Sequence, residues 1–424
     1  MNHVGGVFAL LVCLGVLLQP TAEADGTQSG YEELGKFSGP EDVNSRLVDN
    51  DKKRESTYSF DNIQRNLKPY FDWKRGVNDE HGVSLGSSVY LLYQKAISDL
   101  GGDDYALGYI FRQQGSWNIT CRGTNDPGRL QWRFEARSNI GSFNSPGQLG
   151  GATGVATLAP GFAYSDNFDF DLAIINWTQG FSDGTAGFAA GRLAFDVYLD
   201  AFPFQTFSRG FINRAFILNP TMATTGIGAL GAVVKGFVSD SFWIGAQMHD
   251  ANAASGDFDF DTVQEGEWLK AIEVGWTPSQ SRYKKDRIQF TYWEKDARQL
   301  AGTSKGSGWV ISATYELSDT LIPFVRFGHS DGGAGASAED AFSVGLQISK
   351  AAHEVWSIGA GWAKPSRDTF GPGLGSETVI ETSYQFQLSK NFSLTPDLQV
   401  IFNPANDPGQ SSVWVFGIRG ILSL

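Results

Sequence analysis

Cysteine is almost absent from the chain, whose 424 residues include only Cys13 and Cys121. Cys13 lies in an N-terminal apolar stretch typical of a removable export signal, which leaves Cys121 alone in the mature chain. One cysteine cannot form an internal disulfide bond. The composition therefore excludes a small disulfide-stabilised scaffold.

Long apolar runs are also missing. After residue 24 the sequence has no run of about 18 apolar residues, the length that a membrane-spanning helix needs. The mean hydropathy is −0.21, which is low for a helical membrane protein. A β-barrel fits both the missing apolar runs and the low mean hydropathy, because every second residue of its strands can be polar.

A basic surplus and a histidine cluster are lacking too. The net charge of −13 argues against a nucleic-acid partner. The mature histidines are scattered, and Ser330 follows His329 on a predicted strand, where neighbouring side chains face opposite ways. The aspartates at 257, 259 and 261 lack the glycine and distal glutamate of an EF-hand and favour a solvated loop. We predict no catalytic site, no metal and no cofactor.

The N-terminus is typical of an exported protein. Val7 to Leu18 is a short apolar core, and Ala22-Glu23-Ala24 fits a cleavage site, so residues 1–24 predict a signal peptide. Residues 25–60 are polar and dense in both charge signs, which favours a flexible or peripheral segment. Residues 61–81 predict a short helix or plug, interrupted at Pro69.

From residue 82 to residue 424 the sequence changes to short alternating segments. Ile380, Thr382 and Tyr384, for example, alternate with Glu381 and Ser383. We count sixteen such segments: 82–97, 104–118, 128–140, 168–181, 186–199, 226–238, 241–252, 267–277, 286–298, 307–317, 320–330, 340–350, 354–364, 377–389, 392–403 and 411–424. An even number is typical of bacterial single-chain barrels. We predict an all-β transmembrane antiparallel β-barrel of about 16 strands; a secreted soluble glycan-binding β-sandwich is the alternative.

The final segment shows the two faces of the predicted barrel most clearly. Trp414, Phe416 and Ile418 share one face, and Val415 and Arg419 share the other. A charged side chain is costly against lipid. We therefore expect the aromatic face to meet lipid and Arg419 to face the lumen.

The long connection 198–225 breaks the rhythm of short turns. It contains five phenylalanines, among them Phe204 and Phe207. Arg209 and Arg214 lie among these phenylalanines in the sequence. A loop of this length is uncommon unless it is functional. We expect it to fold inward and narrow the lumen; an extracellular surface loop is the alternative.

Charged residues on the polar faces of the strands predict the pore wall. Arg133, Glu135 and Arg137 share one face of one segment at period two. Arg and Glu can hydrogen-bond sugar hydroxyls, and phenylalanines of the long connection can stack on sugar rings. The other reading is that these charges only solvate the lumen or pair with one another across it. The predicted constriction residues are Arg192, Arg133, Glu135, Arg137, Arg209, Arg214, Phe204, Phe207, Glu381 and Arg419.

Several stretches resemble one family. The run Glu381–Pro408, the pieces Thr395-Pro-Asp-Leu-Gln and Asn403-Pro-Ala, and Gly191-Arg192-Leu are similar to the carbohydrate-selective porins, the OprB family. The resemblance implies a sixteen-stranded outer-membrane porin of a diderm bacterium that passes monosaccharides such as glucose, with Arg192 at a matching position. A non-selective or ion-selective porin is the alternative. Expected partners are small sugars, outer-membrane lipid and the barrel-assembly machinery, with a monomer and a homotrimer both open.

Overall fold

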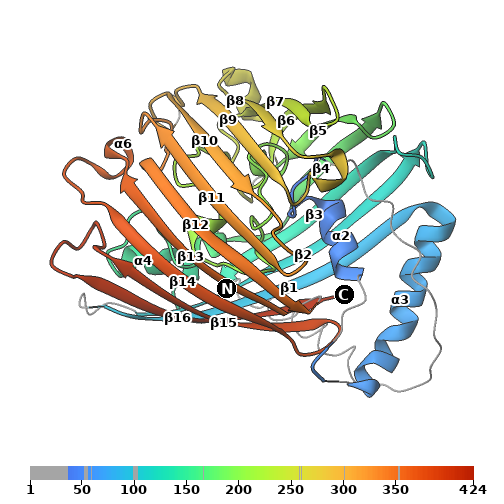
Figure 1. Cartoon of the computed structure of the whole chain (residues 1–424), viewed down its shortest axis with the longest axis horizontal. Helices are drawn as coiled ribbons and strands as arrows, with labels where there is room; N and C mark the ends of the chain where they lie inside the picture. Colours follow the sequence, from blue (N-terminus) through green and yellow to red (C-terminus); the bar gives the residue numbers. More distant parts are fainter. Residues whose placement is uncertain are drawn as a thin grey trace.

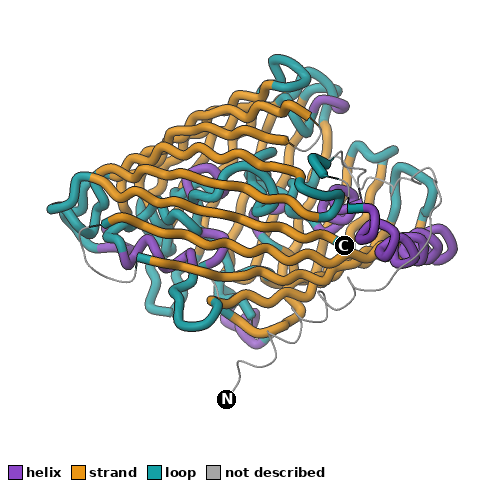
Figure 2. The backbone as a smooth tube through the Cα atoms, turned by 90° about the horizontal axis from the view of Figure 1, so that it is seen from below, coloured by secondary structure: helices purple, strands orange, loops and turns teal. Residues whose placement is uncertain are grey.

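The structure is a computed structural model that describes residues 37–51, 56–58, 60–98, 104–165, 167–256, 258, 260–299, 301–351 and 354–424. The predicted signal peptide, 1–24, lies outside the described residues. Within them, sixteen strands form one closed antiparallel sheet (Figures 1 and 2). Leu91 of the first strand faces Tyr109 of the second and Gly420 of the last, which closes the sheet. The prediction of an antiparallel barrel of about 16 strands is confirmed.

The strands follow one another around the barrel in chain order. They are β1 (Val83–Ile97), β2 (Tyr105–Thr120), β3 (Gly128–Asn139), β4 (Phe168–Phe181), β5 (Ala186–Leu193), β6 (Ala229–Phe237), β7 (Phe242–Asp250), β8 (Trp268–Trp276), β9 (Arg287–Lys295), β10 (Gly306–Thr314), β11 (Leu321–Ser330), β12 (Ala338–Ala351), β13 (Glu354–Pro365), β14 (Glu377–Gln387), β15 (Phe392–Phe402) and β16 (Ser412–Ser423).

The helices precede the barrel or lie in its connections. They are α2 (Val43–Asp51), α3 (Asp61–His81), α4 (Leu149–Ala152), α5 (Arg214–Ile217) and α6 (Arg367–Phe370), with the 3-10 turns η2 (Pro146–Gln148), η3 (Phe162–Tyr164), η4 (Phe195–Val197), η5 (Asp261–Glu265) and η6 (Gln280–Arg282). None of the helices in the described ranges is long and apolar enough to cross a membrane.

The two faces of the sheet differ as the alternation predicts. On β16, Trp414, Phe416 and Ile418 are 43%, 47% and 49% exposed, whereas Arg419 is 1% exposed. Large apolar side chains on the outer face suit lipid contact, and a charge on the inner face avoids it. The connections are short at the end that holds α3 and the C-terminus, and longer at the other end (Figure 1). In barrels of this kind the short turns are periplasmic, so we call this the periplasmic end.

The connection between β5 and β6 folds into the barrel, as expected. It begins at residue 194, earlier than predicted, because β5 ends at Leu193 and the chain turns inward through η4. Phe204 and Phe211 pack their rings against Phe324 of β11, with centroids 5.1 and 5.7 Å apart. A Cβ atom at Gly359 of β13 would lie 2.7 Å from the ring of Phe216, so a glycine there gives the loop room. The inward-folding loop is therefore anchored by aromatic packing.

The expectation of a flexible or peripheral 25–60 segment is wrong for residues 37–51. Helix α2 is held inside the barrel against β1, β2 and β3, and Leu47 is fully buried (Figure 1). Asp42 caps its N-terminus by accepting hydrogen bonds from the amides of Asn44 and Ser45 at 3.1 and 3.4 Å. The polar residues of this segment face the polar lumen. The high polarity of the segment was therefore no sign that it lies in bulk water.

The predicted break at Pro69 is also absent from α3, which runs unbroken from Asp61 to His81 outside the barrel (Figure 1). Pro69 is on the exposed side of the helix, where water can satisfy the carbonyl that the missing amide leaves without a donor. Arg122 of the β2–β3 turn donates to the carbonyls of Asn78 and Asp79 at 2.5 and 2.6 Å. These bonds fix the end of α3 to the periplasmic rim.

Replacement of Ile418 by arginine tests the assignment of the outer face. Ile418 is near the middle of β16, so we expect Ile418→Arg to destabilise the barrel by about 2–4 kcal/mol, the cost of an arginine facing the bilayer midplane. Urea titration of folding into lipid vesicles measures this difference. Ile418→Leu is the control, and equal stability of the two variants would contradict a lipid-facing position.

Candidate functional site

A row of buried charges lines the inner wall of β2 and β3. Glu135 accepts from Arg112 Nε at 2.6 Å and from Arg137 Nε at 2.5 Å. Arg133 donates from Nε to Gln114 Oε1 at 3.1 Å. The structure thus brings Arg133, Glu135 and Arg137 together on the luminal face of one strand. Each arginine is held by a neighbour, so the orientation of the row is set by the wall itself.

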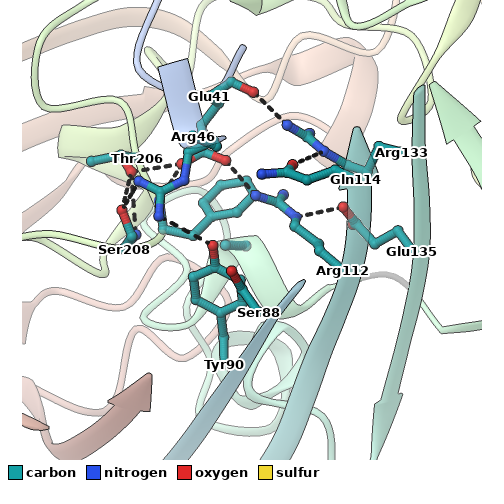
Figure 3. Close-up of polar contacts among 12 residues, drawn as sticks. Glu41, Arg46, Ser88, Tyr90, Arg112, Gln114, Arg133, Glu135, Thr206 and Ser208 are labelled. Carbon is teal, nitrogen blue, oxygen red and sulfur yellow. Dashed lines mark hydrogen bonds and ion pairs between the residues drawn. The ribbon is translucent and has the colours of Figure 1, made fainter. Parts of the chain in front are cut away.

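The turn that precedes helix α2 brings a further carboxylate, that of Glu41, to this row (Figure 3). Glu41 Oε2 accepts from Arg112 Nη1 at 2.5 Å, and the backbone carbonyl of Glu41 accepts from Arg133 Nη2 at 2.6 Å. Glu41 Oε1 accepts from Thr206 Oγ1 at 2.6 Å and from the Phe207 amide at 3.1 Å. One residue therefore joins β2, β3 and the inward-folding loop.

Arg46, one turn along α2, makes a second set of bonds (Figure 3). Its guanidinium donates to Ser208 Oγ at 2.5 Å and to the Tyr90 hydroxyl at 3.4 Å, and it pairs with Asp49 at 3.1 Å. Asn50 then donates to Ser88 Oγ of β1 at 3.1 Å. Successive turns of α2 are thus fastened to the wall and to the loop by polar bonds.

Phe207 is half-buried beside the charged row. Its ring centroid lies 4.9 Å from the guanidinium carbon of Arg112 and 5.4 Å from that of Arg137. Arginines close to an aromatic ring gain cation–π attraction. The arrangement groups a half-buried aromatic ring with buried planar donors and a buried carboxylate, Glu135, on the luminal side of the wall.

Two adjacent carboxyls of the N-terminal segment respond to pH in opposite directions. Burial acts to raise the pKa of Glu41, but Arg112, Arg46 and Arg133 outweigh it, so this pKa lies below its ordinary value. The stabilisation from Glu41 is therefore present at neutral pH and is lost as the pH falls through the lowered pKa. Burial raises the pKa of Asp42, whose contribution is lost as the pH rises. Substitution of Glu41 is thus a cleaner probe than pH.

Two predicted pore residues, Glu381 and Arg419, fasten the loop. Glu381 accepts from the amides of Ile212 and Asn213 at 2.6 and 3.0 Å. Arg419 donates to the carbonyls of Gly210 and Phe211 at 2.8 and 3.3 Å. Both side chains are buried. Their bonds to the inward-folding loop all go to its backbone atoms.

The remaining predicted residues lie apart from the charged row. Arg192, at the extracellular end of β5, donates to the carbonyls of Ala173 and Ala254 at 3.1 and 3.4 Å. Phe204 is buried in the aromatic packing of the loop. Arg209 is exposed and donates to Ser349 Oγ at 3.1 Å, whereas Arg214 lies over the ring of Phe162 at 4.6 Å.

The sequence reasoning missed Glu41 and Arg46. A helix start was readable in Gly39-Pro40-Glu41-Asp42, because Asp is a strong N-cap residue before a segment with apolar Val43 and Leu47 four apart. That signal would have predicted α2, although its place in the lumen was not readable. In the part of the chain that the structure describes, no three His, Cys, Asp or Glu side chains are grouped to hold a metal ion.

A closed sixteen-stranded barrel with a loop folded into a charged lumen defines a porin-type channel. Residues 316–422 match a family described as "Carbohydrate-selective porin, OprB family". Porin AaxA of Chlamydia felis is 26% identical over 221 residues, which cover 50% of this chain and 49% of that protein. Porin AaxA of Chlamydia abortus is 26% identical over 222 residues, which cover 50% and 48%. The chain spans about half the length of these curated relatives.

A solved structure supports the fold. The high-pH structure of Pseudomonas putida OprB has a TM-score of 0.69 to this chain at 14% identity, and the match covers 84% of this chain and 97% of that one. The resemblance to the carbohydrate-selective porins, the OprB family, is confirmed by these matches. The barrel and the family match indicate an outer-membrane location.

Loss of the Glu381 carboxyl is expected to release the loop from the wall. Glu381→Ala leaves the buried amides of Ile212 and Asn213 without acceptors, which removes two hydrogen bonds of roughly 1 kcal/mol each. We expect larger and noisier single-channel conductance in planar bilayers. Glu381→Gln keeps an acceptor and is the control. Identical traces from both variants and the unmodified protein would show that the loop does not depend on these bonds.

Proposed function

We propose that the chain is an outer-membrane porin through which carbohydrates, monosaccharides such as glucose among them, diffuse passively into the periplasm. The observation that carries this proposal is the grouping of Phe207 with Arg112, Arg137 and Glu135. A sugar offers an apolar ring face and a rim of hydroxyls. An aromatic ring suits the first, and planar donors with a carboxylate acceptor suit the second.

The family match and the charged wall support the same proposal. Passive diffusion uses the existing concentration gradient, so the proposal includes no cofactor and no catalytic group. It also includes export by a signal peptide at 1–24, insertion by the barrel-assembly machinery, surrounding outer-membrane lipid, and a monomer or a homotrimer. Of the residues predicted from the sequence, Arg133, Glu135, Arg137 and Phe207 are proposed to act at the constriction, with Glu381 and Arg419 holding the loop that forms it.

Reconstitution of the full chain tests the proposal directly. We expect ion conductance in planar bilayers, concentration-dependent block by glucose, and swelling of protein-containing liposomes in glucose. Protein-free liposomes and a disaccharide of twice the size are the controls. Absence of both conductance and swelling would contradict a porin, and conductance without any sugar block would favour a non-selective or ion-selective channel.

Truncation of Phe207 tests the aromatic contact. We expect Phe207→Ala to weaken glucose block by about 1–2 kcal/mol, a five- to thirtyfold rise in the half-blocking concentration, because the ring face of the sugar loses its partner. Phe207→Tyr keeps the ring and is the matched control. Block titrations on single channels measure both variants. Equal block in the Ala variant would remove Phe207 from the site.

Arg192 is examined in the same assay. It remains a proposed contact from the family resemblance, although its described hydrogen bonds go to the carbonyls of Ala173 and Ala254. A contact with sugar predicts weaker block in Arg192→Ala. Unchanged block would restrict the site to the wall of β2 and β3 and to Phe207.

A further inference from the structure

The surroundings of Glu41 have the form of a binding site for a free carboxylate. We propose that Arg112, Arg133, Thr206 and the Phe207 amide bind the carboxylate of acidic sugars, that Glu41 occupies this site as an internal ligand, and that α2 must leave for such a solute to pass. The inference rests on the proposed porin function and adds to it a substrate class and a means of regulation.

The donors around Glu41 come from three separate parts of the chain. Arg112 is on β2, Arg133 is on β3, and Thr206 with the Phe207 amide is on the inward-folding loop. The carboxylate itself receives three hydrogen bonds, of 2.5 to 3.1 Å, from Arg112, Thr206 and Phe207. Charge-assisted bonds of this kind are the strong ones in proteins.

The site is held in place without Glu41. Glu135 binds Arg112 Nε at 2.6 Å, and Gln114 binds Arg133 Nε at 3.1 Å. Thr206 Oγ1 also accepts from the Ser208 amide at 3.2 Å. Groups that are oriented by other partners keep their geometry when one ligand leaves. An incoming carboxylate would therefore meet donors that already point toward it.

The balance of charge on the wall changes when Glu41 leaves. With α2 in place, Arg112 pairs with the carboxylates of Glu41 and Glu135, Arg137 pairs with Glu135, and Arg133 donates to the backbone carbonyl of Glu41. If α2 and Glu41 leave together, Arg112 loses one of its two described carboxylate partners and keeps Glu135. Buried charges without partners are unfavourable, so the open wall favours an anion. A sugar that carries a carboxylate supplies the missing charge and still presents hydroxyls to the remaining donors.

The attachment of α2 is of a kind that a solute and water can replace. The bonds described from α2 to the wall and loop are hydrogen bonds of Arg46 and Asn50. The buried apolar residues of α2 are Val43 and Leu47, which pack with Ala173 and Ile174. Beside the helix lies a polar cavity of about 230 Å³, lined by Arg46 and Asp49 of α2 and by Lys284 and Arg287 from the far wall. The helix therefore has open space on one side.

Neutralising the internal ligand tests the proposal. In planar bilayers, we expect Glu41→Gln to shift the reversal potential in a salt gradient toward anion selectivity. We also expect it to increase block and flux of glucuronate roughly tenfold, equivalent to about 1.4 kcal/mol. Glucose, which has the same ring without the carboxylate, should respond much less. Asp49→Asn removes one negative charge from α2 itself, close in sequence to Glu41, and is the matched control.

Cross-linking tests whether α2 must move, and does so without removing Glu41. Asn50 and Ser88 are hydrogen-bonded neighbours on α2 and β1, so Asn50→Cys with Ser88→Cys, in a Cys121→Ser background, can be joined by a short, cleavable, bifunctional thiol-reactive reagent. The reagent carries a thiol-reactive methanethiosulfonate at each end, so each cysteine forms a disulfide with loss of methanesulfinate, and a reducing agent cleaves the link. We expect the joined protein to lose glucuronate flux and to regain it after cleavage. The single-cysteine variants treated with the same reagent are the controls.

The outcomes separate the two proposals. If the unmodified protein passes neither glucose nor glucuronate, the porin function itself is wrong. If glucose passes, but glucuronate flux is the same in the unmodified, Glu41→Gln and cross-linked proteins, the porin function stands and the internal-ligand inference is overturned. If Glu41→Gln raises glucose and glucuronate flux equally, α2 is a steric plug only, and the carboxylate site is rejected.

Discussion

The pairing of buried charges inside the barrel is the constraint on which the other features depend. A sixteen-stranded wall encloses more space than its own side chains fill, and the inner face of β2 and β3 presents arginines that cannot remain unpaired away from water. Glu135 satisfies Arg112 and Arg137 along the wall, and Glu41 satisfies Arg112 from within. The position of α2 is thus a consequence of charge that the wall leaves uncompensated.

The same chemistry positions the irregular segments. Glu381 of β14 accepts two loop amides, and Glu273 of β8 accepts the amide of Asp200 at 2.6 Å. Glu377 of β14 accepts the amides of Ala156, Thr157 and Leu158 at 2.6 to 3.1 Å. In each case a carboxyl on a rigid strand binds the backbone of a segment with little secondary structure. Loops that have no ladder of their own obtain a defined path through the lumen in this way.

The sequence predicted the wall far better than its contents. Strict alternation on strands such as β14 and β16 predicts the barrel, because lipid outside and polar groups inside require opposite kinds of side chain at neighbouring residues. The Arg133–Arg137 row followed from the same period. The place of helix α2 in the lumen did not follow, since a polar segment can be solvated or can fill a polar lumen. Phe204 packs on Phe324, and Arg192 donates to the carbonyls of Ala173 and Ala254. These contacts join residues remote in sequence, so a local sequence pattern cannot predict them.

The closed ring of strands has a consequence for the order of assembly. The wall side chains that hold Arg46, Asn50 and Glu41 belong to β1, β2 and β3, and the loop groups precede residue 209. All of them are therefore synthesised before β6 through β16, whereas β1 acquires its second neighbour only with the last strand. A helix docked on the first three strands would be enclosed as the remaining strands complete the circumference. Helix α2 can thus dock on the first strands before the barrel closes, and it need not be threaded through a finished pore.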